Sequence, residues 1–327
     1  MVGFVRDLGA RIGAGFRGGA GSRPGSRLSG PARAALAGIL EAPTFELIPL
    51  KNVHDQAAFL PAGATVSVTA SPAKGIEATL DLAAALETQG FRAIPHLSAR
   101  MIRDRAHLAD VLARLVDAGI DRAFVVGGDA ENPGEFLDGL SLLRAMADLG
   151  NGPRDIGVPC YPQGHAVIPE PALLGALRDK AAFASYMTTQ LCFDAGAIRL
   201  FIAARRTEGI TLPVKIGIPG VAEIPKLLSI SARIGVKDTG RFLSRNARFL
   251  GELLTAGGIY RPTDLLEKLA PVLADPAAAV IDLHVYTFNQ VESTERWRRE
   301  YLGALGSTGG APGGVPVGPA GAAGGPE

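Results

Sequence analysis

Short runs of β-branched and apolar residues alternate along this chain with longer segments in which apolar residues return every three or four positions. This alternation is typical of parallel strands joined by crossover helices. Eight runs have the length and composition of strands: residues 45–50, 65–69, 93–96, 122–126, 156–160, 186–191, 214–218 and 280–285. Eight such strands predict a closed (β/α)8 barrel, which needs about 250 residues and fits within this chain.

The segments between these runs have the spacing of amphipathic helices. The predicted helices span residues 76–89, 107–118, 134–149, 171–183, 196–207 and 221–234. Two more, at 241–256 and 262–273, form an extra pair before the last strand. The helix at 221–234 directly follows Pro219 and Gly220, so its amino terminus can face an anion at the end of the seventh strand.

Composition divides the chain into three parts, of which the middle one, residues 41–303, is the predicted barrel. Residues 1–40 form a basic extension that we expect to be partly disordered. An organelle presequence or an arm that contacts an anionic partner is the alternative, and the extension lacks the continuous apolar centre of a secretory signal. Its first part sets one acid, Asp7, against five basic residues: Arg6, Arg11, Arg17, Arg23 and Arg27. Residues 304–327 are mostly Gly, Pro and Ala, and this composition predicts a disordered tail.

Charge and cysteine content limit the partners and the location of the protein. A formal net charge of +1 gives no general attraction for nucleic acid. No stretch reaches the roughly 18 uncharged apolar residues of a membrane-spanning helix, so no membrane partner is predicted. Cys160 and Cys192 are too few for a disulfide framework and favour the reducing cytoplasm. We expect a cytoplasmic protein with a small-molecule ligand, and a homo-oligomer is compatible with the sequence.

In a closed barrel, catalytic residues gather at the carboxyl ends of the strands. Glu46 lies in an apolar first strand, where burial disfavours the ionised carboxylate, so this group can hold a proton and deliver it. The alternative is a structural ion pair with a lysine or arginine at the barrel base. The sequence Gly127-Gly128-Asp129 follows the fourth strand and is either a ligand-contacting loop or an ordinary turn.

Three other side chains have both a chemical and a structural interpretation. His96 and His165 follow strands and can donate to a cofactor, or they can be ordinary core residues. Lys215, on the seventh strand, can form a Schiff base as in an aldolase, but a structural lysine is favoured. The sequence contains no histidine or cysteine pattern of metal ligands, no GxSxG elbow and no P-loop, so we predict no metal, serine hydrolase or nucleotide triphosphatase.

Seven segments between residues 44 and 292, taken in order, resemble the catalytic barrel of methylenetetrahydrofolate reductases. In one-letter code they are TFELIPLK (44–51), VSVT (66–69), PHLS (95–98), VVGGD (125–129), YPQGH (161–165), TTQLCFD (188–194) and LHVYTFN (283–289). The resemblance implies hydride transfer from NAD(P)H, through FAD, to 5,10-methylenetetrahydrofolate, which gives 5-methyltetrahydrofolate, or the reverse oxidation. It therefore also implies a place in one-carbon metabolism and methionine biosynthesis.

The resemblance also assigns roles to residues of this chain. Glu46 takes the role of the general acid, and Asp129 that of the carboxylate that stabilises the developing positive charge. Gln190 and Tyr286 are implied to bind the substrate, with Gln190 hydrogen-bonded to the pterin. The residues implied to contact the cofactor are Thr69, His96, Gly128, Asp129, Tyr161, His165 and Lys180.

The departures from the family pattern fall mostly on the cofactor side. Gly127 and Gln290 each stand where the family has an arginine. Leu173 or a neighbour stands where the family has an aspartate, and Ile224 stands where it often has an aromatic residue. Flavin-free relatives that pass hydride directly from a nicotinamide cofactor resemble the same barrel, so this mechanism stays open beside FAD. A deazaflavin-dependent reductase, an aldolase that uses Lys215 and a non-catalytic folate-binding protein are the remaining alternatives.

Overall fold

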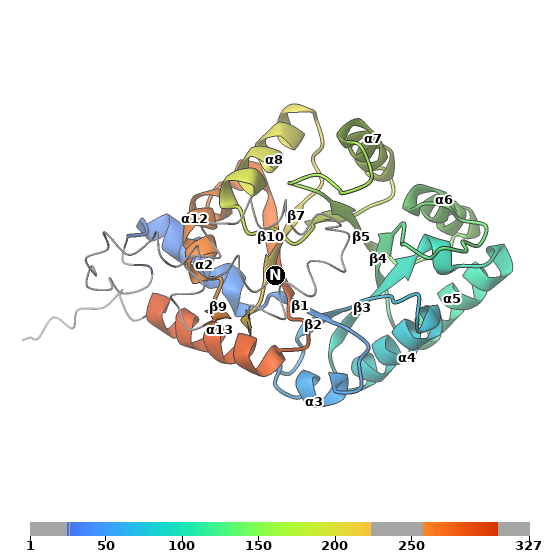
Figure 1. Cartoon of the computed structure of the whole chain (residues 1–327), viewed down its shortest axis with the longest axis horizontal. Coiled ribbons are helices and arrows are strands. Elements are labelled where there is room, and N and C mark those ends of the chain that lie inside the picture. Colours follow the sequence, from blue (N-terminus) through green and yellow to red (C-terminus); the bar gives the residue numbers. More distant parts are fainter. Residues whose placement is uncertain (1–24, 26, 224–257, 307–327) are drawn as a thin grey trace, which may run out of the picture.

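Eight parallel strands form a closed barrel at the centre of the protein (Figure 1). The computed structural model describes residues 25, 27–223 and 258–306. The order of the strands around the barrel is β1-β10-β7-β6-β5-β4-β3-β2, and every neighbouring pair is parallel. The barrel strands are β1 (Thr44–Leu47), β2 (Thr65–Val68), β3 (Arg92–Ser98), β4 (Arg122–Val126), β5 (Asp155–Cys160), β6 (Tyr186–Thr189), β7 (Val214–Pro219) and β10 (Val280–Tyr286). All eight predicted strands are confirmed.

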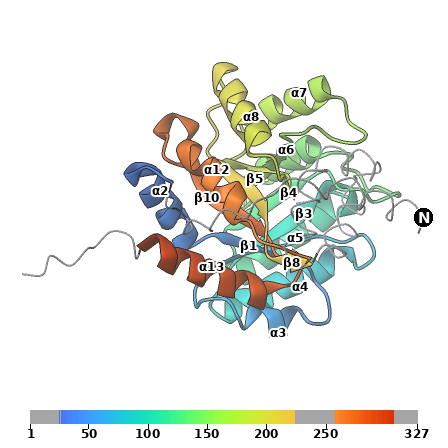
Figure 2. The same ribbon diagram turned by 60° about the vertical axis from the view of Figure 1, so that its left-hand side comes forward.

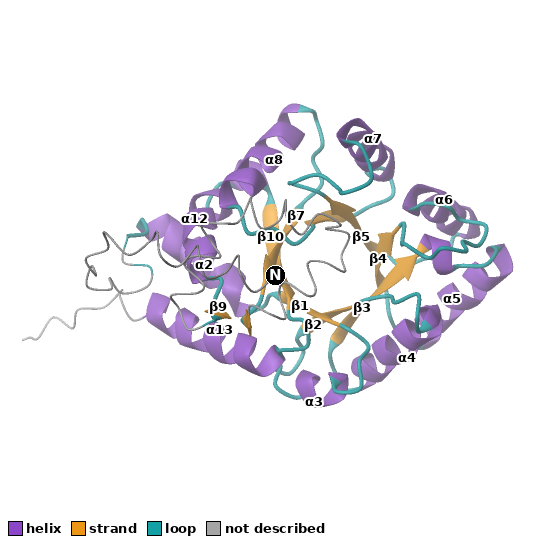
Figure 3. Ribbon diagram, in the orientation of Figure 1, coloured by secondary structure: helices purple, strands orange, loops and turns teal. Residues whose placement is uncertain are grey.

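Helices surround the barrel on its outer side (Figure 3). The described helices are α2 (Gly30–Glu41), α3 (Val53–Ala57), α4 (Gly75–Thr88), α5 (Arg105–Asp117), α6 (Gly139–Leu149), α7 (Glu170–Lys180), α8 (Ala195–Thr207), α12 (Thr263–Leu273) and α13 (Val291–Gly306), with short 3-10 turns η1 (Ala99–Met101) and η2 (Pro276–Ala278). Side chains on one face of each strand pack against this layer, as Ala93 and Leu97 of β3 do. The opposite face points into the barrel, where Ile94, Phe124 and Tyr186 form a separate small cluster.

Two predicted helices differ from the structure at their amino ends. The helix predicted from residue 134 begins at Gly139, because the Asp138 carboxylate caps it by accepting a 2.9 Å hydrogen bond from the Ser141 amide. The helix predicted at 221–234 is wrong at its start, where Ala222–Glu223 forms strand β8 and pairs with β9 (Ile259–Tyr260). The rest of that helix and the helix predicted at 241–256 lie outside the described residues.

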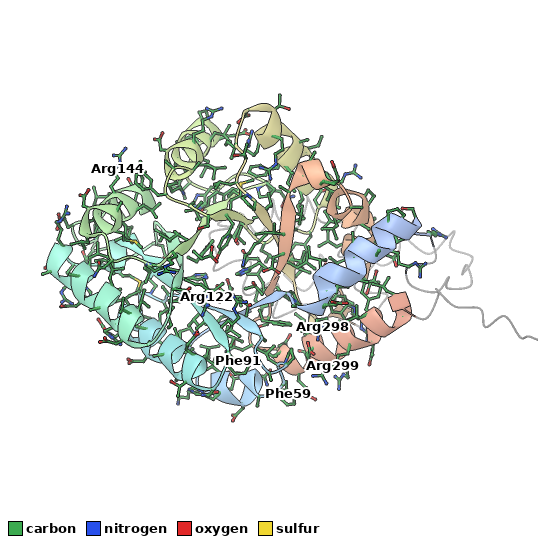
Figure 4. The ribbon with its side chains drawn as sticks, turned by 180° about the vertical axis from the view of Figure 1, so that it is seen from behind. Phe59, Phe91, Arg122, Arg144, Arg298 and Arg299 are labelled. Carbon is green, nitrogen blue, oxygen red and sulfur yellow. The ribbon has the colours of Figure 1, made fainter. Side chains whose placement is uncertain are left out.

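Two helices that we did not predict, α2 and α13, lie side by side at one edge of the barrel (Figures 1 and 2). Leu36 and Leu40 of α2 are completely or almost completely buried. Arg298 of α13 donates to the carbonyl oxygens of Leu40 and Glu41 and forms a buried ion pair with Glu295 (Figure 4). The basic residues from Arg6 to Arg23 and the segment after Gly306 lie outside the described residues. No described helix is long and apolar enough to cross a bilayer.

Candidate active site

Glu46 lies on β1 and points into the barrel, where it is 9% exposed. Its Oε2 atom is 3.1 Å from Nε2 of His284 on β10 and 4.0 Å from Nε2 of His96 on β3. Among the described residues, Glu46 forms no ion pair with a lysine or arginine, which the structural alternative required. Both histidines approach the same oxygen, and no hydrogen bond from the described part of the chain reaches Oε1. The histidines therefore contact the Glu46 carboxylate only at Oε2, and Oε1 has no hydrogen-bond partner among the described residues.

His96 is a neutral partner of this carboxylate at pH 7. Burial lowers the pKa of His96 to about 4, although the charge of Glu46 acts in the opposite direction. The Nε2 atom of His96 lies 2.7 Å from Oγ of Ser67 on β2, and its ring centroid is 4.9 Å from that of Phe124 on β4. Five neighbouring strands, β10 and β1 to β4, thus contribute side chains to one buried network around the carboxyl group.

Tyr286 covers the other side of His284, with its ring centroid 4.9 Å from the imidazole. Its hydroxyl donates to the carbonyl oxygen of Thr189 at 3.2 Å. Burial, together with the charge of Glu46, raises the pKa of Tyr286 well above its usual value, so the phenol stays protonated. Gly217 leaves room for this ring, since a Cβ atom there would lie 2.7 Å from Cε2 of Tyr286.

The segment that follows β10 holds the backbone of β1 in place. The Thr287 hydroxyl donates to the carbonyl oxygen of Glu46 at 2.5 Å. The Asn289 side chain accepts from the Ile48 amide at 2.9 Å and donates to the Ile48 carbonyl oxygen at 2.8 Å. Asn289 has a φ of 53°, a left-handed conformation that asparagine adopts more readily than most residues. The position of Glu46 is therefore fixed from the last strand of the barrel.

A second group of predicted site residues lies at the ends of β5 and β6. The rings of Tyr161 and His165 are in edge contact, with centroids 5.4 Å apart. The Gln190 amide donates to the Cys160 carbonyl oxygen at 2.8 Å, which places Gln190 beside the end of β5. Burial lowers the pKa of Lys180 and raises that of Tyr161 to about 12. Lys180 is half-buried, and the carboxylate of Asp138 acts against this lowering of its pKa.

The remaining predicted residues follow β2 and β4. Gly128 has a φ of +84°, and a Cβ atom there would overlap Oγ of Ser98, so the loop needs glycine at this position. Asp129, the next residue, is exposed. The Thr69 amide donates to the Leu47 carbonyl oxygen at 3.0 Å, next to the end of β1. Among the described residues, no hydrogen bond connects Glu46 directly to Asp129 or to Gln190.

Lys215 lies inside the barrel in a closed set of contacts. Its Nζ atom is 3.1 Å from Oδ2 of Asp282 and 4.3 Å from the ring centroid of Tyr186. Thr44 donates to the same Asp282 oxygen at 2.6 Å. The lysine is 7% exposed. These contacts support a structural role for Lys215, and no group of three His, Cys, Asp or Glu residues in the described part is arranged to hold a metal ion.

Sequence reasoning did not select three residues of the network around Glu46: His284, Ser67 and Phe124. His284 stands two residues before Tyr286, so the two-residue period of a strand places both on the same face. Ser67 likewise stands two residues before Thr69. That period, applied backwards from the residues at the strand ends, was the signal that could have found His284 and Ser67.

Comparisons with known proteins found similar solved structures and one matching family. A phosphonomutase, as its structure is described, from Burkholderia cenocepacia J2315 is similar over 85% of this chain and 100% of that chain, with 12% identity and a TM-score of 0.45. The tryptophan synthase alpha subunit from Legionella pneumophila str. Paris is similar over 86% of this chain and 100% of that chain, with 9% identity and a TM-score of 0.43. The model of the methylenetetrahydrofolate reductase family matches residues 50–297. The chain belongs to the methylenetetrahydrofolate reductase family.

Proposed function

We propose that this protein reduces 5,10-methylenetetrahydrofolate to 5-methyltetrahydrofolate, with NAD(P)H as the source of the hydride. The observation that carries the proposal is the buried Glu46 carboxyl group, which histidines hold through Oε2 and which keeps Oε1 available. In the proposed reaction this carboxyl group gives a proton to a basic atom of the bound ligand. Glu46 is four residues before the segment that matches the family, so its role rests on this geometry and on the resemblance of residues 44–51.

The substrate needs a proton before it can accept hydride. Its bridging carbon is bonded to both N5 and N10, and both nitrogen atoms donate electrons to it. When Glu46 gives its proton to N10, the bond between carbon and N10 breaks, and its electron pair stays on N10. The carbon is then part of an N5 iminium cation, which hydride converts to a methyl group. One proton and one hydride are consumed, so the reaction balances.

Other residues bind the substrate and stabilise the cation in this proposal. Gln190 follows β6 and Tyr286 is the last residue of β10. Both would bind the pterin, Gln190 through paired donor and acceptor groups. Asp129, which is exposed on the loop after β4, would stabilise the positive charge of the iminium cation. His284 would act as a positioning residue, since it holds Oε2 while Oε1 meets the substrate.

One residue on the other part of the rim fits a polar cofactor such as FAD. The hydroxyl of Ser98 is buried without a hydrogen-bond partner in the described part of the chain, and it fills the space beside Gly128, where an added Cβ atom would overlap it. A polar cofactor edge that reached this hydroxyl would satisfy it. Thr69, His96, Tyr161, His165 and Lys180 would supply the other contacts. Bound FAD would take two electrons from NAD(P)H and supply the hydride; without it, NAD(P)H would supply the hydride directly.

The test is the variant Glu46→Gln, which keeps the shape of the side chain and removes its acid function. We expect folate reduction to fall by about 10²–10⁴-fold, the usual contribution of a general acid. Glu41→Gln is the matched control, because Glu41 is exposed at the end of α2. Unimpaired folate turnover by Glu46→Gln would exclude this role. The absorption spectrum of the purified protein separates the two hydride routes, since only a flavoprotein has the flavin band.

A further inference from the structure

A pocket lies at the carboxyl ends of β2, β3 and β4, beside the residues assigned above to the cofactor. Its volume is about 350 Å³, within the range of roughly 300–1,000 Å³ typical of small-molecule sites. Arg100 and Arg103, which follow β3, contribute the charged side chains that line it. The other lining residues used below are Gly75, at the start of α4, and Asn132 and Gly134, on the loop after β4.

The backbone of this pocket is built so that both arginines stay at its wall. Arg100 donates from its amide to the Gly127 carbonyl oxygen at 3.1 Å and from Nε to the Ala130 carbonyl oxygen at 2.8 Å. Gly134 packs so closely against the turn after β3 that an added Cβ atom would lie 2.6 Å from Cα of Arg103. The loops after β3 and β4 are therefore fixed to each other around the two side chains.

The two charged side chains that line the pocket are both arginines. No aspartate or glutamate lines it, although Asp104, Asp129, Glu131 and Glu135 each adjoin a lining residue in the sequence. Neither arginine forms an ion pair with a carboxylate in the described part of the chain. Arg100 is half-buried, with only its Nε atom engaged by Ala130, while Arg103 is exposed. Gly75 adds the amino end of α4, which carries a partial positive charge. Two guanidinium groups at one pocket are typical of phosphate recognition, because their planar donors match phosphate oxygens.

We propose that Arg100 and Arg103 bind the phosphate groups of the adenine dinucleotide that brings the hydride. This inference rests on the proposed function, which requires such a dinucleotide. It also depends on the placement of the pocket. The pocket is formed after β2, β3 and β4, and the same strands or the loops after them carry the residues assigned to the cofactor: Thr69, His96, Gly128 and Asp129. Gln190 and Tyr286, assigned to the folate, come from β6 and β10. The anion at this pocket therefore belongs to the hydride donor and not to the glutamate tail of the folate.

The experiment measures equilibrium binding by the full-length protein in the absence of folate. The probes are ADP-ribose, which has the pyrophosphate and no nicotinamide, 2′-phospho-ADP-ribose and FAD. The variants are Arg100→Gln and Arg103→Gln. The matched control is Arg92→Gln, since Arg92 is an exposed arginine at the opposite, amino-terminal end of β3. Calorimetry at low and at physiological salt gives the dissociation constant for each pair.

We expect each pocket variant to raise the dissociation constant of at least one probe by roughly ten- to a hundredfold, the usual effect of losing a charged hydrogen bond. Arg92→Gln should leave all the values unchanged. Weaker binding of every probe assigns the pocket to the pyrophosphate. Weaker binding of 2′-phospho-ADP-ribose alone assigns it to the 2′-phosphate of NADPH, and weaker binding of FAD alone assigns it to the flavin cofactor. Each of these three outcomes supports a phosphate site.

Two outcomes would overturn the inference. One is unchanged affinity of both variants for all three probes. The other, from steady-state kinetics run beside the calorimetry, is a raised KM for the folate with no change for any probe. If Arg100→Gln does not fold, Arg103→Gln still decides the question, because its side chain is exposed. The proposed function can fail separately: a protein that binds ADP-ribose through these arginines but reduces no methylenetetrahydrofolate would keep the phosphate site and lose the reaction.

Discussion

The Nε2 atom of His284 lies 3.1 Å from Oε2 of Glu46, and both side chains are buried in the barrel. This hydrogen bond fixes the orientation of the carboxyl group from the opposite end of the chain, since the two residues are separated by 238 positions. A proton donor must be within hydrogen-bond reach of the atom that it protonates, so its orientation is part of its function. Replacement of the histidine should therefore affect catalysis even though His284 is not assigned to the substrate.

We expect His284→Asn to lower kcat for folate reduction by roughly ten- to a hundredfold, because it removes a hydrogen bond to a carboxylate. The KM for NAD(P)H should change little, since His284 is not assigned to the cofactor. Steady-state kinetics measures both quantities. His54→Asn, at an exposed position of α3, is the control. A variant that loses stability but keeps kcat would show that His284 is only structural.

His96 predicts a specific dependence of stability on pH. Its pKa is about 4 in the folded protein and near the ordinary value of 6.5 in the unfolded chain. Between these values the unfolded chain binds a proton that the folded protein does not, so the free energy of unfolding decreases as the pH falls from about 6.5 to about 4. The decrease should be on the order of 3 kcal/mol at most.

Denaturant unfolding at pH 7.5, 6.5, 5.5 and 4.5 measures this effect as the difference between the wild type and His96→Asn. Asparagine can keep a hydrogen bond to Ser67 and has no charge to gain. The variant should therefore lose less stability than the wild type over this range. Parallel curves for the two proteins would contradict a buried, neutral His96.

Gly217→Ala should destabilise the protein by about 1–3 kcal/mol, the usual cost of excess volume in a packed interior. The added methyl group would overlap the carbonyl oxygen of Thr189 and the ring of Tyr286. Urea unfolding measures the change. Gly38→Ala on α2 is the matched control, since nothing lies within 4 Å of the added atom, and helix propensity predicts a small gain in stability. Equal effects of the two substitutions would show that the ring of Tyr286 is not confined there.

Lys215→Met should lower the free energy of unfolding by roughly 3–5 kcal/mol, because it leaves the Asp282 carboxylate buried without its partner. Lys268→Met is the control, since Lys268 forms an exposed pair with Asp264 on α12. Borohydride in the presence of a carbonyl compound should not change the mass of the wild-type protein. A mass increase located at Lys215 would instead support the aldolase alternative.

The strands of this fold were predictable because the hydrophobic period changes sharply between strands and helices. The burial of Glu46 was predictable for a related reason, since it is a charged residue within an apolar strand. The partner of Glu46 was not identified, because the pairing of β1 with β10 closes the barrel and is a contact between the two ends of the chain. Sequence spacing within one segment carries no information about such a contact.

The missed elements have local physical reasons. Helix α2 was included in the basic extension because residues 1–40 contain ten glycines and six arginines, while its buried face consists of only Ala32, Leu36 and Leu40. The start of the helix predicted at 221–234 had a suitable apolar period. Pairing of Ala222–Glu223 with Ile259–Tyr260 gives this short segment hydrogen bonds that depend on distant residues, so the tertiary structure overrides the local pattern.

The bonds from Thr287 and Asn289 to the first strand also determine when the surroundings of Glu46 form during synthesis. Glu46 leaves the ribosome early, but the residues that orient it are translated about 240 positions later, as the separations of 238 and 241 show. A nascent chain therefore carries the Glu46 carboxyl group before the residues that orient it are present. These contacts form only when β10 pairs with β1 and closes the barrel.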